Sequence, residues 1–201
     1  MSRFQLPVQM EHWFMFLQIG ICATVLFIID ESVHHLLNYN SLMITAGEYW
    51  RAISGHLLHT NFYHLCLNVG GLFLLWALHG EYYRPAMLLG LFISIAVTIS
   101  VTMLLFSDIA LYVGLSGVIH GLFVWGVLQD IKYKDPTGWL LLIAIIAKIT
   151  HEQIAGGDAH TAMLIEANVA FDAHLFGAIA GTLCAFIFKP LAKIKQAPEG
   201  A

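Results

Sequence analysis

The feature that most constrains this chain is a series of long apolar stretches that contain few charges. A helix needs about 20 mostly apolar residues to cross the hydrocarbon core of a bilayer. Stretches of this kind lie near residues 13–29, 57–79, 86–106, 112–129, 138–155 and 169–188. Only 11% of the 201 residues are charged, whereas soluble domains carry about 25%. We therefore predict an all-α membrane protein in which residues 1–201 form a single domain with six transmembrane helices.

Two of the six stretches are interrupted by polar residues. The fifth contains Lys148, and the second contains His59, Asn61, His64 and Asn68, which lower its hydropathy. Polar groups within a span usually face the protein interior or a water-filled cavity rather than lipid. We therefore expect the second helix to line a wet cavity.

The basic residues predict the orientation of the chain. One side, formed by the N-terminus, two loops and the C-terminal tail, carries Arg3, Arg84, Lys132, Lys134, Lys189, Lys193 and Lys195. The other side carries Arg51 and Lys148. Cytoplasmic loops have an excess of Lys and Arg, so both termini are predicted to be cytoplasmic. The net charge of -4 gives no reason to expect a nucleic-acid partner.

The three cysteines, Cys22, Cys66 and Cys184, all lie inside apolar stretches. Their spacing fits neither a disulfide framework nor a zinc site. Buried cysteine usually behaves as a small hydrophobic residue, so we expect all three to pack in the core.

Three of the predicted helices bring polar side chains to the same depth, because the second, fourth and sixth spans all run inward from the outer side. His64 and Asn68 lie in the outer half of the second span. Ser116 lies in the first turns of the fourth, and His174 lies near the start of the sixth. Polar residues within spans often mark function, so this shared level in the outer leaflet is a candidate site.

Glycines predict that the fourth and sixth helices pack closely. Gly117 and Gly121 form a small-xxx-small ridge in GLSGVIHG, and Gly177 and Gly181 form another in HLFGAIAG. Such ridges let two helix backbones approach each other. Packing along them would bring the serine of the fourth helix level with the histidine of the sixth, within the reach that a nucleophile and its base require.

His120 is a second candidate base, because it follows Ser116 by four residues in the sequence. Residues i and i+4 share one face of a helix, so spacing alone does not exclude it. The common depth favours His174. A lone serine in a membrane helix usually packs against a neighbour or bonds its own backbone, so the serine by itself is weak evidence for catalysis.

An acyl-transfer site also needs hydrogen-bond donors aimed at the developing oxyanion. His64 and Asn68 are spaced i, i+4, share one helix face, and can both donate. Ser116 starts a helix, where backbone N–H groups lack intrahelical partners and the dipole favours negative charge. These groups are the candidate donors.

These residues together resemble the rhomboid family of intramembrane serine proteases in its basic six-span form. The matching segments are WR at residues 50–51, HTNFYHLCLN at 59–68, GLSG at 114–117 and AHLFGAIAG at 173–181. Each segment is short, but four of them in the right order, on helices of the right direction, are specific. The resemblance implies a six-helix rhomboid-like bundle.

The resemblance implies Ser116 as the nucleophile and His174 as the base, with no acidic third member. It implies an oxyanion hole formed by His64, Asn68 and the backbone N–H of Ser116. No metal and no cofactor are implied.

Other residues are expected to support this site. His59 in the histidine-and-asparagine helix, and Gly114 and Gly117 in the serine motif, match the family pattern. Many relatives have a tyrosine at the position of His120 that packs on the catalytic histidine, so we interpret His120 as the floor of the site. Asp172, two residues before the predicted base, is interpreted as an interfacial residue.

The resemblance also implies the substrate and the location. Rhomboid proteases cleave single-span membrane proteins near the outer face of the bilayer. The short first loop and GLSGVIHGLFVWG are similar to bacterial rhombosortases, which are thought to process secreted proteins with a C-terminal Gly-Gly, a single span and basic residues. We therefore expect a multi-pass protein of the bacterial inner membrane, with its site on the periplasmic or extracellular side.

Two other functions stay open. A catalytically inactive relative that binds membrane clients would typically lack the serine or the histidine, and both are present here. A metal or proton transporter is suggested by the 11 histidines and by His56 and His59 at i, i+3. Carboxylates are usual in such ion paths, and the sequence places few within the predicted spans.

Overall fold

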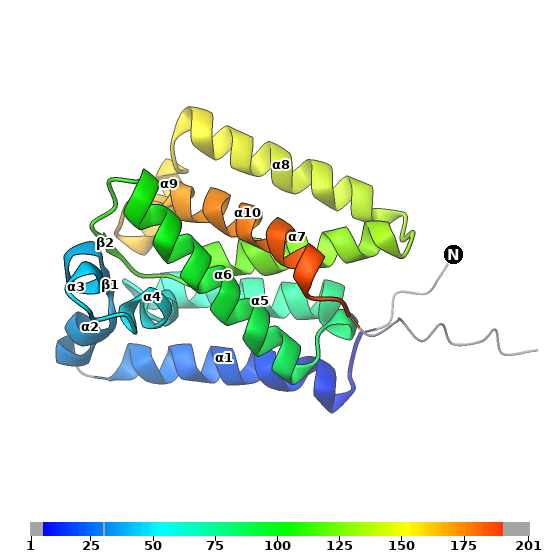
Figure 1. Ribbon diagram of the computed structural model, residues 1–201, viewed down its shortest axis with the longest axis horizontal. Helices are drawn as coiled ribbons and strands as arrows, with labels where there is room; N and C mark the ends of the chain where they lie inside the picture. The colour runs from blue at the N-terminus through cyan, green and yellow to red at the C-terminus, as the bar shows by residue number, and fades with distance from the viewer. Residues whose placement is uncertain (1–5, 30, 191–201) are drawn as a thin grey trace, which may run out of the picture.

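Six long helices form one bundle in the computed structural model, which describes residues 6–29 and 31–190 (Figure 1). These helices are α1 (Met10–Ile28), α5 (Phe62–His79), α6 (Pro85–Phe106), α7 (Ser116–Lys132), α8 (Thr137–Ala155) and α10 (Phe171–Ile187). They correspond in order to the six predicted spans. Arg3, Lys193 and Lys195, which entered the orientation argument, lie outside the described residues.

Four helices within the described ranges are long and apolar enough to cross a membrane. They cover Met10–Ile28, Phe62–Tyr82, Pro85–Phe106 and Thr137–Ala155. Helix α10 is apolar but shorter. Helix α7 begins at residue 116 rather than 112, because the preceding segment forms strand β2 (Leu111–Tyr112). The chain is a multi-pass membrane protein, while the count of six spans, the cytoplasmic termini and the single domain stay predictions.

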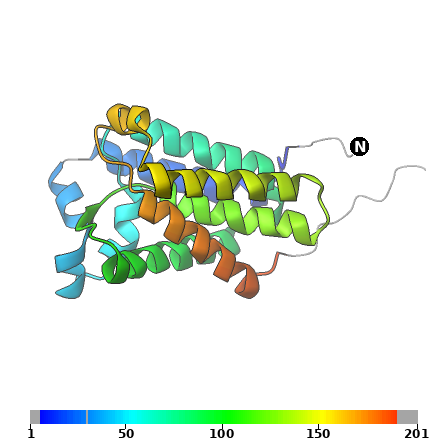
Figure 2. The same ribbon diagram turned by 90° about the horizontal axis from the view of Figure 1, so that it is seen from above.

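Short elements gather at one end of the bundle, opposite the start of α1 and the end of α10 (Figures 1 and 2). They are α2 (Glu31–Leu37), β1 (Tyr39–Asn40), α3 (Ser41–Thr45), α4 (Arg51–Ser54), the 3-10 helix η1 (Gly55–Leu57), β2 and α9 (Ala159–Ile165). A further 3-10 helix, η2 (Gly80–Tyr82), follows α5. Strands β1 and β2 pair antiparallel, with Tyr39 opposite Tyr112.

Arg51 holds this end together from the start of α4. Its side chain is buried, and its guanidinium donates to the Glu48 carboxylate at 2.6 Å. It also donates to the carbonyl oxygens of His35 and Asn38 at 2.8 and 3.0 Å. A buried cation needs such partners, and here they fix the loop between α2 and β1.

Side-chain caps set the start of the two helices that border this end. The Asn61 side chain accepts the N–H of His64 at 2.9 Å and starts α5. The Asp158 carboxylate accepts the N–H and the hydroxyl of Thr161 and starts α9, and these bonds hold the pKa of Asp158 below its ordinary value. Gly156, with φ of +79°, ends α8 in a conformation that favours glycine.

The most extensive helix contact joins α7 and α10 along the two glycine ridges. A Cβ on Gly121 would lie 2.6 Å from the carbonyl oxygen of Gly177, and one on Gly117 would lie 2.8 Å from that of Ala173. Gly181 faces the backbone of Gly121 in the same way. The predicted close packing is confirmed, and the two backbones touch with no side chain between them.

The outer faces of α1 and α8 carry exposed apolar side chains, such as Leu17 and Ile143, which suit contact with lipid. Cys22 and Cys66 are exposed as well, whereas Cys184 is buried. The prediction of core packing was therefore wrong for two of the three cysteines. In a bilayer the lipid-facing surface of a helix is as apolar as its packed face, so hydropathy does not separate the two.

A buried polar cluster, the His79 cluster, lies at the other end of the bundle where α5 and α7 end. Nε2 of His79 lies 3.0 Å from one carboxylate oxygen of Asp130, and the hydroxyl of Tyr82 donates to the other at 2.8 Å. All three side chains are buried. The cluster ties η2 and the end of α5 to the end of α7.

Candidate active site

A cavity of about 890 Å³ lies at the end of the bundle where the short elements gather. The polar residues lining it are Asn38, Thr60, His64, Asn68, Ser116, His120, Lys148, Glu152, Asp158, Thr161, Asn168, Asp172 and His174. His64, Asn68, Ser116 and His174, predicted to share one level, therefore line one cavity. His59 and Asn61, which were also expected on the cavity-lining helix, precede α5 and do not line it. The size of the cavity and the polar side chains among its mostly apolar lining leave places for water.

Ser116 and His174 meet directly inside this cavity. The Oγ of Ser116, the first residue of α7, lies 2.9 Å from Nε2 of His174 in the first turn of α10. The imidazole is buried. Since the glycine ridges bring the two backbones into contact just below, the separation of serine and histidine is fixed by the main chain.

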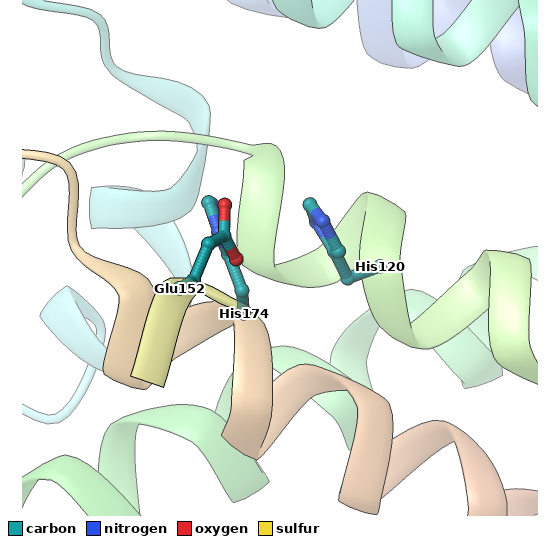
Figure 3. Close-up of side chains that lie close together, drawn as sticks. All are labelled: His120, Glu152 and His174. Carbon is teal, nitrogen blue, oxygen red and sulfur yellow. The ribbon is translucent and has the colours of Figure 1, made fainter. Parts of the chain in front are cut away.

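Glu152 on α8 contacts the other nitrogen of the His174 ring, which the sequence argument did not foresee. Its Oε2 lies 3.0 Å from Nδ1 of His174, and its Oε1 accepts from Nζ of Lys148 at 2.6 Å. Figure 3 shows Glu152, His174 and His120 approaching one another from α8, α10 and α7. A carboxylate thus bonds the histidine, a partner that the sequence analysis did not expect; the catalytic dyad of Ser116 and His174 stays a prediction.

The orientation of the serine–histidine bond follows from this carboxylate. An ionised carboxylate only accepts hydrogen bonds, so the proton of a neutral His174 ring lies on Nδ1. Nε2 is then the acceptor and the Ser116 hydroxyl is the donor. The arrangement is that of a nucleophile whose proton already points at a base.

His120 lies beside this pair rather than in it. Its ring stacks on that of His174, with centroids 4.1 Å apart and planes inclined by 14°. Its Nδ1 lies 2.7 Å from the backbone carbonyl oxygen of Ser116. A carbonyl oxygen accepts, so Nδ1 of His120 is the donor. The i, i+4 spacing thus joins His120 to the backbone of the serine and not to its hydroxyl.

The three candidate oxyanion donors surround the same cavity. His64 is anchored through Nδ1, 3.1 Å from the hydroxyl oxygen of Thr60, which leaves Nε2 as its other ring nitrogen. The Asn68 amide donates to the carbonyl of His64 at 3.1 Å. An amide has two N–H groups, so one remains. Ser116 begins α7, and no side chain caps the N–H groups there.

Gly114 and His59 fix the position of the His64 ring. Gly114 has φ of +138°, and a Cβ there would lie 3.0 Å from the His64 ring. The ring of His59 packs edge-on against that of His64 with centroids 5.0 Å apart. Burial, and next the neighbouring His64 ring, lower the pKa of His59 to about 3. His59 is therefore a neutral packing partner.

Asp172 bonds elsewhere, although it precedes His174 by only two residues. Its carboxylate accepts from the hydroxyl of Ser107 at 2.6 Å. That bond joins the start of α10 to the end of α6. The interfacial interpretation of Asp172 stays a prediction.

The donor atoms of His120, Glu152 and His174 lie within 4.8 Å of one another, close enough to raise the question of a shared metal ion. A metal binds a histidine nitrogen along the lone pair in the ring plane. The two rings are nearly parallel and stacked, so their lone pairs do not converge on one point. Both nitrogens of His174 are already hydrogen-bonded, and we assign no metal to this cluster.

The family comparison agrees with the helical membrane fold. The family model described as Rhomboid domain matches residues 46–191, which run from before α4 to beyond the end of α10. The chain belongs to the rhomboid family. Rhomboid proteins are in general intramembrane serine proteases that act on membrane proteins within the bilayer, although inactive members exist. No curated protein matches the chain significantly.

Proposed function

We propose that this protein is an active intramembrane serine endopeptidase with Ser116 as nucleophile and His174 as base. The observation that carries the proposal is the 2.9 Å contact between Ser116 Oγ and His174 Nε2 inside a polar cavity. An inactive, client-binding relative has no need of this contact. A serine hydroxyl is a poor nucleophile unless a neighbouring base accepts its proton.

The chemistry follows in two steps. Ser116 Oγ attacks the carbonyl carbon of the scissile bond while its proton moves to Nε2 of His174. The C–N bond then breaks, and the same proton leaves with the amine. Water next attacks the acyl ester, gives a proton to His174, and the serine departs by taking that proton back. The cavity supplies the space for this water.

The negative charge on the substrate oxygen needs donors in the transition state. We assign this role to the Ser116 backbone N–H, the His64 ring and the remaining N–H of Asn68. Their common position around the cavity supports the assignment. Losing one such donor costs about a hundredfold or more in soluble proteases.

The substrate is proposed to be a single-span membrane protein cut near the outer face of the bacterial inner membrane. The excess of Lys and Arg on the opposite side supports this orientation. The rhombosortase resemblance adds a narrower proposal, a C-terminal sorting tail with Gly-Gly before the span. Sequence similarity alone supports that substrate.

A metal or proton transporter is less well supported. Glu152 does supply an intramembrane carboxylate, so the scarcity of such groups no longer argues against transport. Both of its oxygens are engaged, however, by Lys148 and His174. Stoichiometric metal in the purified protein would favour this alternative.

A fluorophosphonate probe tests the proposed function without knowledge of the substrate, because it phosphonylates only an activated serine. We expect the purified protein in proteoliposomes to be labelled at Ser116, as located by peptide mass spectrometry. Ser116→Ala should abolish labelling and any cleavage of a tethered substrate while the thermal unfolding midpoint stays unchanged. Absence of labelling in the folded wild-type protein would refute the proposal.

A further inference from the structure

We propose that Glu152 is a positioning residue for His174, which makes the site a serine–histidine–glutamate triad held in place by Lys148. The inference rests on the proposed function, since it assigns a role towards the reacting base. Glu152 does not touch the serine; it acts through the far nitrogen of the imidazole, 3.0 Å away. Both side chains are buried.

The first part of this role is the choice of tautomer. A neutral imidazole serves as base only if Nε2, the nitrogen facing Ser116, carries no proton. The carboxylate accepts a hydrogen bond from Nδ1 and so holds the single ring proton there. Without an acceptor at that position, nothing among these contacts would favour the productive tautomer over the unproductive one.

The second part is stabilisation of charge. When Nε2 takes the serine proton, the ring becomes an imidazolium in a buried site, where an uncompensated charge is costly. Glu152 then faces the cation through a charge-assisted hydrogen bond, which is about twice as strong as a neutral one. This gain appears only after proton transfer, which is the condition for accelerating the chemical step.

Lys148 explains how a carboxylate is kept in a membrane-spanning helix. A charged residue inside a span is rare unless it is paired, and Lys148 lies one turn away on α8 with its Nζ 2.6 Å from Oε1. The two carboxylate oxygens are divided, one to the lysine and one to the histidine. The lysine therefore orients the carboxylate and offsets its charge.

The other groups facing His174 do not replace Glu152. His120 from α7 stacks on the ring face and has no contact with Nδ1 of His174 in the hydrogen bonds described. Asp172, on the same helix as His174, is bonded to Ser107. His64 on α5 adds another imidazole at the cavity. Among the described residues near the ring, Glu152 is the carboxylate in hydrogen-bonding distance.

Two variants with opposite charge changes distinguish a positioning role of Glu152 towards His174 from a role limited to the packing of α8. Glu152→Gln removes the negative charge and leaves Lys148 unpaired, whereas Lys148→Met removes the positive charge and leaves the carboxylate on His174. The rate of fluorophosphonate labelling at Ser116 would be measured from about pH 5 to 9 in proteoliposomes. Labelling forms an Oγ–P bond, expels fluoride and sends the serine proton to His174.

We expect Glu152→Gln to lower the maximal labelling rate by roughly 10 to 1000-fold. This is less than the loss of about 10⁴-fold for the acidic member of soluble triads, because the glutamine side-chain oxygen can still accept a hydrogen bond from Nδ1. The acid-side midpoint of its pH profile should move down by about one pH unit or more, because the imidazolium loses its partner. Lys148→Met should move that midpoint up. A role limited to packing α8 would lower both rates without moving the midpoints in opposite directions.

The outcomes distinguish this inference from the proposed function. If wild type is labelled at Ser116 and Glu152→Gln keeps both its rate and its midpoint, the triad is wrong and the dyad stands. If wild type is not labelled, the proposed function and the triad fail together. Should Glu152→Gln not fold, judged by its unfolding midpoint, Glu152→Asp and Lys148→Met decide: unchanged midpoints in both would overturn the triad.

Discussion

Among the described residues, two buried histidine–carboxylate pairs have the same contact distance, one at each end of the bundle. His174 and Glu152 lie 3.0 Å apart, and so do His79 and Asp130. The second ring nitrogen of His174 contacts the Ser116 hydroxyl inside a cavity. The free nitrogen of His79 is buried without a hydrogen-bond partner among the described residues.

The partners of the carboxylates differ as well. Asp130 accepts a hydrogen bond from the Tyr82 hydroxyl, a neutral donor. A Cβ on Gly126 would lie only 2.7 Å from the His79 ring, so the α7 backbone packs directly against that ring. Glu152 accepts a hydrogen bond from the ammonium group of Lys148 and lines the cavity. A histidine–carboxylate pair is thus not a sign of catalysis by itself. The two pairs differ in the serine hydroxyl on the second nitrogen of His174 and in the cavity beside it.

The largest effect should come from removing the histidine of each pair. His174→Ala removes the base, so labelling and cleavage should fall by at least about a thousandfold. His79→Ala removes one of the two hydrogen-bond partners of the buried Asp130 carboxylate, so it should lower the free energy of unfolding by about 3 kcal/mol. Its labelling rate per folded molecule should stay at the wild-type value. A tenfold loss of that rate in folded His79→Ala would mean that the two ends are coupled.

A smaller effect is expected from separating α7 and α10. Gly177→Ala would place a Cβ against the backbone of Gly117, so the helices must shift apart. A displacement near 1 Å at a catalytic pair costs about a hundredfold in rate. Gly70→Ala on α5 is the matched control, because nothing lies within 4 Å of a Cβ there. Equal labelling rates in the two variants would show that the ridge does not set the geometry of the site.

The smallest effect should come from His120, which stacks on the base without bonding its nitrogens. His120→Ala removes the stacked ring and the bond to the Ser116 carbonyl, and we expect about a tenfold lower rate, within the range of one aromatic contact. His120→Phe keeps a ring of similar shape. Recovery of nearly the full rate by the phenylalanine would assign His120 to packing, whereas an equally slow variant would assign it to the bond.

The sequence predicted the parts of the site whose signals are local. Hydropathy located the six long helices, the glycine spacing indicated that α7 and α10 touch, and the motifs singled out Ser116 and His174. Glu152 was missed because its contact with His174 depends on the rotation of α8 about its own axis relative to α10. No local sequence pattern predicts that rotation. Lys148 and Glu152 at i, i+4 within an apolar helix were the available signal. Paired charges in a span are a reason to look for a third partner.

Other misses have the same origin. The His79–Asp130 pair joins residues 51 positions apart, and the pairing of β1 with β2 joins segments on either side of α5 and α6. Both depend on tertiary contacts. Cys22 and Cys66 were assigned to the core because lipid and core are equally apolar. In a membrane helix the hydrophobic periodicity that distinguishes the core-facing side from the lipid-facing side is weak, because both sides are apolar. Polar and small residues therefore give most of the information about which side of a helix packs in the protein.

The separation of Ser116 and His174 along the chain has a consequence for biogenesis. They lie 58 positions apart, with α8 and α9 between them. Membrane helices insert first and associate afterwards, so a nascent chain that has released α7 and α8 holds the serine and the glutamate but not the histidine. Under the proposed function, proteolytic competence would arise only when α10 docks on the glycines of α7, and a partly synthesised chain could not cut its neighbours.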